Sequence, residues 1–282
     1  MEPVPTSDEV DVERPAESAA VRTRGGLRVA KKIAGRAAIP ILIFVVFVSL
    51  WEFVVAVFEI PEYILPRPSA ISASFSGEWG EIWHHTQLTA KEAILGYLIG
   101  NGLAVVMAAF MAEFPFLERN FYPYVVLQRS LPIVTVAPLL IIWFGFTIWP
   151  IVLAAALICF FPTLVNGIQG FKSADRTTLE LMRGLNASRW QTFRYVKLPN
   201  ALPYIFAALK TSVASAMVGA VVGEWIAADE GLGFLTIRAN NFVDTLLLFR
   251  AVLAIGVLGV VWFLIVTALE ARALRWNRAE HP

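Results

Sequence analysis

Long apolar runs, each about as long as a lipid bilayer is thick, recur along the 282-residue chain. A helix needs about 20 mostly apolar residues to cross the hydrocarbon core. Six runs meet this requirement, and they cover residues 39–58, 88–111, 121–144, 148–171, 204–228 and 246–269. The pattern therefore predicts an all-α membrane protein with six transmembrane helices.

The third run differs from the other five because Arg129, Pro132 and Pro138 interrupt it. Irregular backbone at membrane depth is tolerated only where it packs in protein or lines a cavity. We therefore expect residues 121–144 to face a pathway, with Arg129 and Pro132 among its candidate residues.

The two ends of the chain are polar. Six acidic residues lie within the first seventeen positions, and a basic stretch follows before the first run. This composition cannot bury enough apolar surface to fold alone, so residues 1–38 are predicted to be a flexible tail. The expected organisation is this N-terminal tail, a transmembrane domain over 39–270 and a C-terminal tail over 271–282.

Positive charge is distributed unevenly between the connecting segments. Residues 1–38 hold seven Lys or Arg residues and 172–203 hold six, whereas 59–87 and 229–245 hold only Arg67 and Arg238. Cytoplasmic segments carry the excess of Lys and Arg. Six crossings with both termini in the cytoplasm satisfy these counts.

The segment 172–203 has a helical pattern of its own. A short helix is expected over 178–185, with Asp175 near its start, followed by a turn at Asn186, because Asn tolerates the left-handed conformation. Ser188 and Gln191 have the spacing of a capping box and predict a second helix. That helix is expected to stop before Pro199.

Apolar Trp190, Phe193 and Val196 recur at three-residue spacing in this second helix. Such a surface is typical of a docking site for another protein. An amphipathic hairpin lying on anionic lipid headgroups is the alternative that the pattern alone leaves open.

Composition supports the membrane reading and excludes other classes. The chain is 57% hydrophobic and 16% charged, whereas a soluble domain carries about 25% charged residues. A net charge of +1 gives no reason to expect nucleic acid as a partner. The only cysteine, Cys159, excludes a disulfide framework, and three histidines make a metal site improbable.

Charges inside the apolar runs are functional candidates by default. Glu52, Arg129 and Glu224 are such charges. Arg129 either lines the pathway or pairs with a carboxylate, and pairing is favoured. For Glu224, we expect a role in an outer gate with Gly231 and Gly233, with a packing role between helices as the alternative. Glu52 is expected to reach the lipid headgroups.

Two glycine pairs have the small-x3-small spacing that lets helices approach closely. They are Gly96 with Gly100 and Gly219 with Gly223. We expect all four to serve helix packing rather than substrate contact.

The segment 172–203 resembles the cytoplasmic "EAA" loop of binding-protein-dependent ABC importer permeases, whose pattern is E-A-A-x3-G-x9-I-x-L-P. Glu180, Leu198 and Pro199 are in register, whereas Leu181, Met182, Asn186 and Val196 depart from the pattern. The resemblance implies an ATPase-docking loop formed by Glu180, Leu181, Met182, Arg183, Gly184, Leu185, Asn186, Ala187, Leu198 and Pro199.

Further motifs, from Trp51-Glu52 to Leu274-Arg-Trp276, resemble the taurine, nitrate and sulfonate branch of this family. The stretches around Glu180, 201–210 and 218–224 look most like members assigned to thiamine-pyrimidine precursors or riboflavin. The family's fold is that of a type I ABC importer permease in the bacterial cytoplasmic membrane.

The resemblance also implies partners: a second permease chain, as a homodimer, two ABC ATPase subunits that bind ATP and Mg²⁺, and an extracytoplasmic substrate-binding protein. The chain has no Gly-Lys dipeptide and hence no Walker-type phosphate loop. We therefore expect a transport subunit that binds no cofactor and catalyses no reaction itself.

Two other classes remain as alternatives. An ion-coupled secondary carrier would use Glu52, Arg129 and Glu224 as coupling residues, although carriers often show repeated halves that this chain lacks. A membrane-embedded enzyme is disfavoured, because no nucleophile–base cluster or metal-ligand spacing is present.

Overall fold

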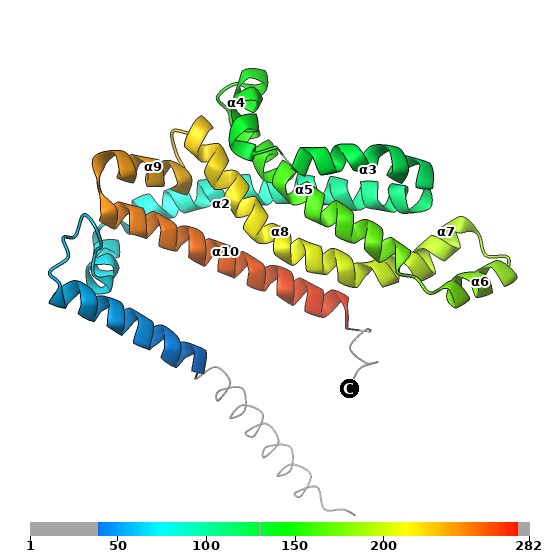
Figure 1. Ribbon diagram of the computed structural model, residues 1–282, viewed down its shortest axis with the longest axis horizontal. Coiled ribbons are helices and arrows are strands. Elements are labelled where there is room, and N and C mark those ends of the chain that lie inside the picture. The colour runs from blue at the N-terminus through cyan, green and yellow to red at the C-terminus, as the bar shows by residue number, and fades with distance from the viewer. Residues whose placement is uncertain (1–38, 130, 276–282) are drawn as a thin grey trace, which may run out of the picture. The chain divides into compact units, whose positions relative to one another are not determined.

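The computed structural model describes residues 39–129 and 131–275 and divides into two compact units. The described part of the first unit is residues 39–60 with Arg67–Ser69, and the second unit holds Pro61–Pro66 and the chain from Ala70 onward. Every regular element in these stretches is a helix (Figure 1), which confirms the all-α prediction. The tail predicted over 1–38 lies outside the described residues.

The first unit contains the apolar helix Ile39–Val57. Near its end, the Glu52 carboxylate accepts hydrogen bonds from the backbone N–H of Ser69 at 3.0 Å and from the Ser69 hydroxyl at 2.7 Å. Ser69 is the second residue of the next helix, and a carboxylate is stabilised at a helix N-terminus. Glu52 therefore holds a helix start rather than reaching outward alone.

The later elements follow in chain order. They are α2 (Pro68–Glu113), α3 (Pro115–Arg129), α4 (Ile133–Phe144), α5 (Ile148–Lys172), α6 (Arg176–Gly184), α7 (Arg189–Thr192), the π-helical turn η1 (Phe193–Lys197), α8 (Leu198–Ala227), α9 (Leu232–Phe242) and α10 (Thr245–Ala273). Among the described residues, five helical stretches are long and apolar enough to cross a membrane: Ile39–Val57, α2, α5, Arg189–Ala227 and α10.

The third apolar run, 121–144, does not form one continuous helix. The chain forms two shorter helices there, α3 and α4, and Pro132 stands in extended conformation just before α4. Proline disfavours helical geometry in the residue that precedes it, here Leu131, so the helix is broken. The apolar count was right, but it could not reveal that the chain changes direction.

Two predicted connections are also more helical than expected. α2 begins at Pro68, with a kink at Glu78, and not at residue 88. The segment 229–245 contains α9. The apolar runs identify the stretches that a membrane can cover, whereas helices continue beyond them where protein packing supplies the contacts.

Helices α2, α5 and α8 approach one another closely at the predicted glycines. A Cβ added at Gly96 would lie 2.5 Å from the Cβ of Ala155, and one added at Gly219 would lie 2.5 Å from the Cα of Ala155. Added Cβ atoms at Gly100 and Gly223 would clash with α5 in the same way. The packing role predicted for both glycine pairs is therefore confirmed.

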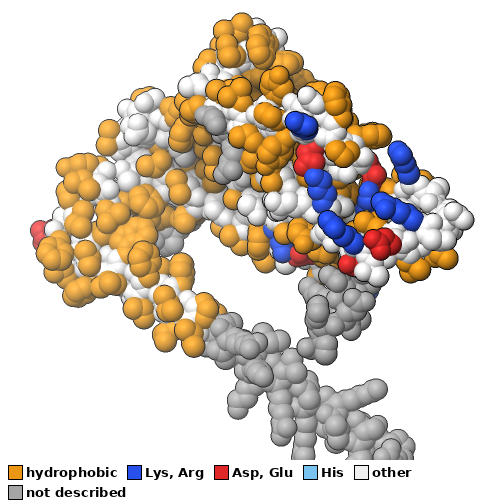
Figure 2. All heavy atoms as spheres, turned by 45° about the vertical axis from the view of Figure 1, so that its right-hand side comes forward, with side chains coloured by type: hydrophobic (Ala, Val, Ile, Leu, Met, Phe, Trp, Pro, Cys, Tyr) orange, Lys and Arg blue, Asp and Glu red, His pale blue; other side chains and the backbone are white. Residues whose placement is uncertain are grey.

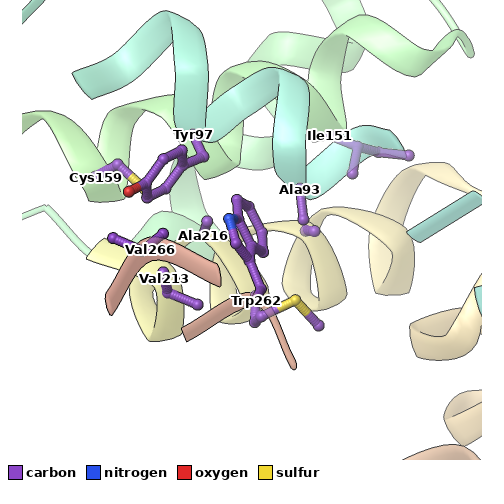
Figure 3. Close-up of a cluster of buried hydrophobic side chains, with 10 residues drawn as sticks. Ala93, Tyr97, Ile151, Cys159, Val213, Ala216, Trp262 and Val266 are labelled. Carbon is purple, nitrogen blue, oxygen red and sulfur yellow. The ribbon is translucent and has the colours of Figure 1, made fainter. Parts of the chain in front are cut away.

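A buried cluster joins these three helices to α10 (Figure 3). The rings of Tyr97 and Trp262 meet edge-on with centroids 4.8 Å apart, and the Tyr97 hydroxyl donates to the Leu209 carbonyl at 3.0 Å. Cys159 lies buried in the same cluster. Its small side chain thus serves the core.

Ion pairs connect the segments at each end of the second unit. At the α6–α7 end, Lys172 binds Glu118 and Lys197 binds Glu113, both at 2.5 Å. At the α9 end, Arg238 binds Glu81 at 3.0 Å, and Arg250 binds Glu78. The segments predicted to share one side of a membrane therefore lie together, at opposite ends of the helices (Figure 1).

Candidate functional site

Glu224 lies in the last turn of α8 and is only 1% exposed. Its carboxylate accepts a hydrogen bond from the Thr89 hydroxyl of α2 at 2.6 Å and another from the Gly233 backbone N–H at 2.5 Å. Hydrogen bonds of this kind are required to stabilise a buried carboxylate. Glu224 thus joins the end of α8 to α2 and to the start of α9.

The backbone that enters α9 is bound in the same way. The Gly231 N–H donates to Nδ1 of His85 at 2.8 Å, and the Leu232 N–H donates to the Thr89 hydroxyl at 2.8 Å. These bonds satisfy the N–H groups that any helix start leaves without intrahelical acceptors. The residues that form this arrangement are called the Glu224 cluster: His85, Thr89, Glu92, Glu224, Gly231, Leu232 and Gly233.

Glycine is required at residue 231 for two reasons. Its φ is +112°, a region that side chains disfavour, and an added Cβ would overlap the Glu224 carboxyl carbon. A Cβ at Gly233 would lie 2.7 Å from Glu224 Oε2. The structure therefore brings together the three residues Glu224, Gly231 and Gly233 that the sequence had suggested.

The sequence did not reveal the partners on α2. The Glu92 side chain of α2 is buried, and its Oε2 has no hydrogen-bond partner among the described residues. His85, Thr89 and Glu92 lie four and three residues apart, on one helix face, and this spacing is the signal that could have found them.

The remaining candidate residues lie elsewhere. Pro132 immediately precedes α4, while the side chain of Arg129 lies outside the described residues. Arg250 of α10, which no sequence pattern had indicated, is buried against Glu78. Within residues 39–129 and 131–275, no three His, Cys, Asp or Glu side chains converge as metal ligands.

The 172–203 segment forms a second candidate site at the other end of α5 and α8. The Asp175 side chain accepts from the Thr178 N–H at 3.2 Å and caps α6, and Asn186 adopts φ +53° at the turn. The capping box between Ser188 and Gln191 is present with both of its hydrogen bonds. These local predictions are confirmed.

The second helix does not stop before Pro199, so that prediction is wrong. α7, η1 and α8 form one helical stretch from Arg189 to Ala227. Pro199 is the second residue of α8, where a missing N–H is tolerated, and the wider π turn of η1 precedes it.

The surface of this segment is apolar and basic. Leu181 is 61% exposed and Leu185 is 68% exposed, and the Trp190 ring stacks on Phe193 with centroids 5.8 Å apart. Lys and Arg side chains gather at this end of the molecule (Figure 2). Residues 172–203 contain six such residues, Lys172, Arg176, Arg183, Arg189, Arg194 and Lys197.

Most of the predicted docking residues are accessible. The exposed ones are Glu180, Leu181, Arg183, Gly184, Leu185 and Asn186, and the half-buried ones are Met182, Ala187, Leu198 and Pro199. α6 has no buried residue at all. Only Leu179 and Met182 of this helix are half-buried, and its other residues are exposed.

A cavity of about 700 Å³ lies between the two ends. Its lining comes from residues 131–136 and from α5 and α8, and its polar side chains are Asn166, Thr211 and Ser215. The broken third segment thus borders a cavity of the size that binds small molecules.

Buried polar contacts fix the helices behind the cavity. The Thr163 hydroxyl donates to Oδ1 of Asn101 at 2.5 Å and lies 3.0 Å from the Ser212 hydroxyl. These three residues belong to α2, α5 and α8. A fully paired buried network of this kind holds helices in one arrangement.

Comparisons with known proteins agree on a family. Residues 100–275 match the family described as "binding-protein-dependent transport system inner membrane component". The riboflavin transport system permease protein RibX of Chloroflexus aurantiacus is 34% identical over 244 residues, which are 85% of this chain and 90% of that protein. The formylaminopyrimidine transport permease protein ThiX of Halalkalibacterium halodurans is 32% identical over 86% of this chain and 96% of that protein.

A more distant relative and a solved structure extend the comparison. The putative aliphatic sulfonates transport permease protein SsuC of Bacillus subtilis is 29% identical over 85% of this chain and 87% of that protein. The crystal structure of an amino acid ABC transporter with histidines superposes with a TM-score of 0.55 and 21% identity, over 72% of this chain and 97% of the other. That likeness concerns the fold.

Proposed function

The chain belongs to the binding-protein-dependent transport system inner membrane components and is a permease subunit of an ABC importer, and from this premise we propose how its parts divide the work. The 172–203 segment receives a separate ATPase that binds ATP and Mg²⁺. The cavity beside α4, α5 and α8 is the pathway, and the Glu224 cluster is its outer gate.

The helix from Arg189 to Ala227 is the observation that carries this proposal. It holds 39 residues, or about 58 Å at 1.5 Å per residue. One end bears Trp190 on the exposed segment, and the other bears Glu224 in the buried cluster. Displacement of the docking end by an ATPase is therefore transmitted along one helix, past the cavity, to the gate.

We further propose six crossings with both termini in the cytoplasm, α3 and α4 together forming the third. The distribution of Lys and Arg supports this orientation, and so does the grouping of the connections by ion pairs at the two ends. A second copy of the chain completes the pathway, and an extracytoplasmic binding protein delivers the solute. The solutes named for the relatives, a flavin, a pyrimidine and sulfonates, define the range to be tested.

Orientation can be tested with single cysteines. Cys159 is buried, so Leu185→Cys and Glu230→Cys can be compared in a Cys159→Ala background with a membrane-impermeant maleimide. We expect labelling of residue 230 in intact cells and of residue 185 only after permeabilisation. The reverse pattern would overturn the orientation.

Docking can be tested with a matched pair of substitutions at Leu185. Leu185→Arg places a charge on the exposed apolar surface and should release the ATPase from the purified complex, whereas Leu185→Met should retain it. Both variants should elute and melt like the wild type, because residue 185 is exposed. An ATPase that stays bound and coupled to Leu185→Arg would contradict the docking assignment.

The hydrogen bonds made by the intramembrane acidic residues argue against the ion-coupled carrier alternative. Glu52 is engaged by Ser69, and Glu224 is engaged by Thr89 and Gly233. Uptake that continues on ATP after ion gradients collapse is the expected result in vesicles; uptake that stops would restore the carrier.

A further inference from the structure

An open groove of about 390 Å³ lies where the last turns of α2 meet α7 and η1. One wall consists of side chains of α2, among them Val106 and Phe110, and the other wall holds Trp190 and Phe193. Val106, Phe110 and Trp190 are exposed. Large apolar side chains that surround an open groove favour a ligand or a partner that removes them from water.

The groove runs along the apolar part of a membrane-crossing helix. α2 is one of the helices long and apolar enough to cross a membrane, and its last residue is Glu113. Val106 precedes Glu113 by seven residues, or about 10 Å along the helix axis. The groove therefore begins at the charged end of α2 and continues beside its apolar stretch. Lipid acyl chains cover a surface at this depth, whereas an ATPase in the aqueous phase reaches only its charged end.

The charged end of the groove offers a cation. Among the described residues that line it, the charged ones are Glu113 and Arg189. Lys197 binds Glu113 at 2.5 Å and neutralises that carboxylate. Arg189 is exposed, and no carboxylate in the described part of the chain forms an ion pair with it. A guanidinium group binds phosphate oxygens with two parallel N–H donors, so it suits a phosphate headgroup.

The aromatic wall is formed without a ligand. The Trp190 ring stacks on Phe193, and Phe193 stacks on buried Phe171 with centroids 5.5 Å apart. Tryptophan is enriched at the level of lipid headgroups, because its ring is apolar and its N–H is polar. α6 contributes no residue to the described lining. Its exposed Leu181 and Leu185 therefore remain available to the ATPase while the groove is occupied.

We propose that this groove binds an anionic phospholipid of the adjoining leaflet. The lipid phosphate contacts Arg189, and an acyl chain lies against Phe110 and Trp190. The described residues that line the groove are different from those that line the 700 Å³ cavity. The lipid site is therefore distinct from the proposed pathway, and it lies beside the proposed docking helix α6.

Photocrosslinking in bilayers of known composition tests the proposal. The complete transporter, with p-benzoylphenylalanine at position 110, is reconstituted into vesicles of equal parts phosphatidylglycerol and phosphatidylcholine, and its adducts are identified by mass spectrometry. The same probe at position 260, exposed on α10, reports the bulk lipid. We expect phosphatidylglycerol adducts to be enriched about fivefold at position 110 relative to position 260, the effect of one cation on an anionic headgroup.

Two arginine substitutions locate the cation. Arg189→Gln should reduce the enrichment at position 110 to the value at position 260. Arg176→Gln removes the same charge from exposed α6, outside the groove, and should retain the enrichment. Equal lipid ratios at positions 110 and 260 would reveal bulk lipid only and overturn the proposal. Adducts of position 110 with the ATPase or with a second permease chain would assign the groove to a protein partner, and equal losses in both arginine variants would contradict the role of Arg189.

Discussion

The two ends of α8 are built in opposite ways. At one end, Glu224 is buried and bound by side-chain and backbone donors from α2 and α9. At the other, α6 has no buried residue, and Leu181 and Leu185 are exposed. Internal hydrogen bonds determine the geometry of the first end, whereas the second end presents its apolar side chains outward.

Because the two ends are built differently, substitutions at the Glu224 end should change the stability of the fold, and substitutions at the other end should change coupling to the ATPase. Substitutions in the Glu224 cluster disturb buried polar groups, and these are expensive to leave without partners. Substitutions of exposed residues in α6 change a surface and leave the fold largely unaffected. Three of the four predictions compare the two ends and the fourth compares two positions within the 172–203 segment, from the largest expected effect to the smallest.

Gly231→Ala should destabilise the protein most, by about 4 kcal/mol, because it combines a disfavoured φ with overlap on the Glu224 carboxyl. Gly184→Ala, in α6, is the control: its Cβ would meet nothing within 4 Å, and it should be neutral or slightly stabilising. Thermal unfolding in detergent measures both. Similar melting temperatures for the two variants would show that the close approach at residue 231 is unimportant.

Glu224→Ala should cost about 3 kcal/mol, because the Thr89 hydroxyl and the Gly233 N–H lose their buried acceptor. Hydrogen exchange of the Gly233 amide should accelerate accordingly. Glu180→Ala should leave exchange and melting unchanged while weakening ATPase association. A Glu224→Ala protein with wild-type exchange would return this residue to a passive packing role.

Ser188→Ala should weaken the start of α7 by about 1 kcal/mol, the usual effect of losing an N-cap. The backbone N–H of Gln191 donates to the Ser188 hydroxyl at 3.2 Å, so its hydrogen exchange should become faster when the hydroxyl is lost. Ser76→Ala is the control, because that exposed hydroxyl only donates to the Ala73 carbonyl. Equal protection of Gln191 in both variants would contradict a stabilising capping box.

Asn186→Gly should have the smallest effect, a stabilisation of a few tenths of a kcal/mol, because glycine adopts φ +53° without strain. Asn200→Gly, inside α8, should instead destabilise by about 1 kcal/mol. Melting temperatures that shift in the same direction would show that the turn at residue 186 is not strained.

Local sequence signals predicted the 172–203 segment well. The Asp175 cap, the capping box and the left-handed Asn186 each depend on a few consecutive residues. The glycine pairs also stand within one turn of a helix. Interactions of short range leave a readable pattern in the chain.

Interactions between distant residues were harder to foresee. Glu224 and Thr89 lie 135 positions apart, and their hydrogen bond depends on how α2 and α8 cross. The break at Pro132 and the continuous helix through Pro199 show the same limit. Proline changes the backbone in both places, but only the surrounding packing decides whether the helix ends or continues.

The sequence by itself determined the helical class, the apolar lengths that suit a bilayer and the local caps, because these depend on hydrophobicity and on neighbouring residues. The tertiary structure alone decided which helices meet at Ala155, which donors surround Glu224 and which groups line the cavity. Those contacts join residues far apart in the chain, and their geometry exists only once the helices have packed.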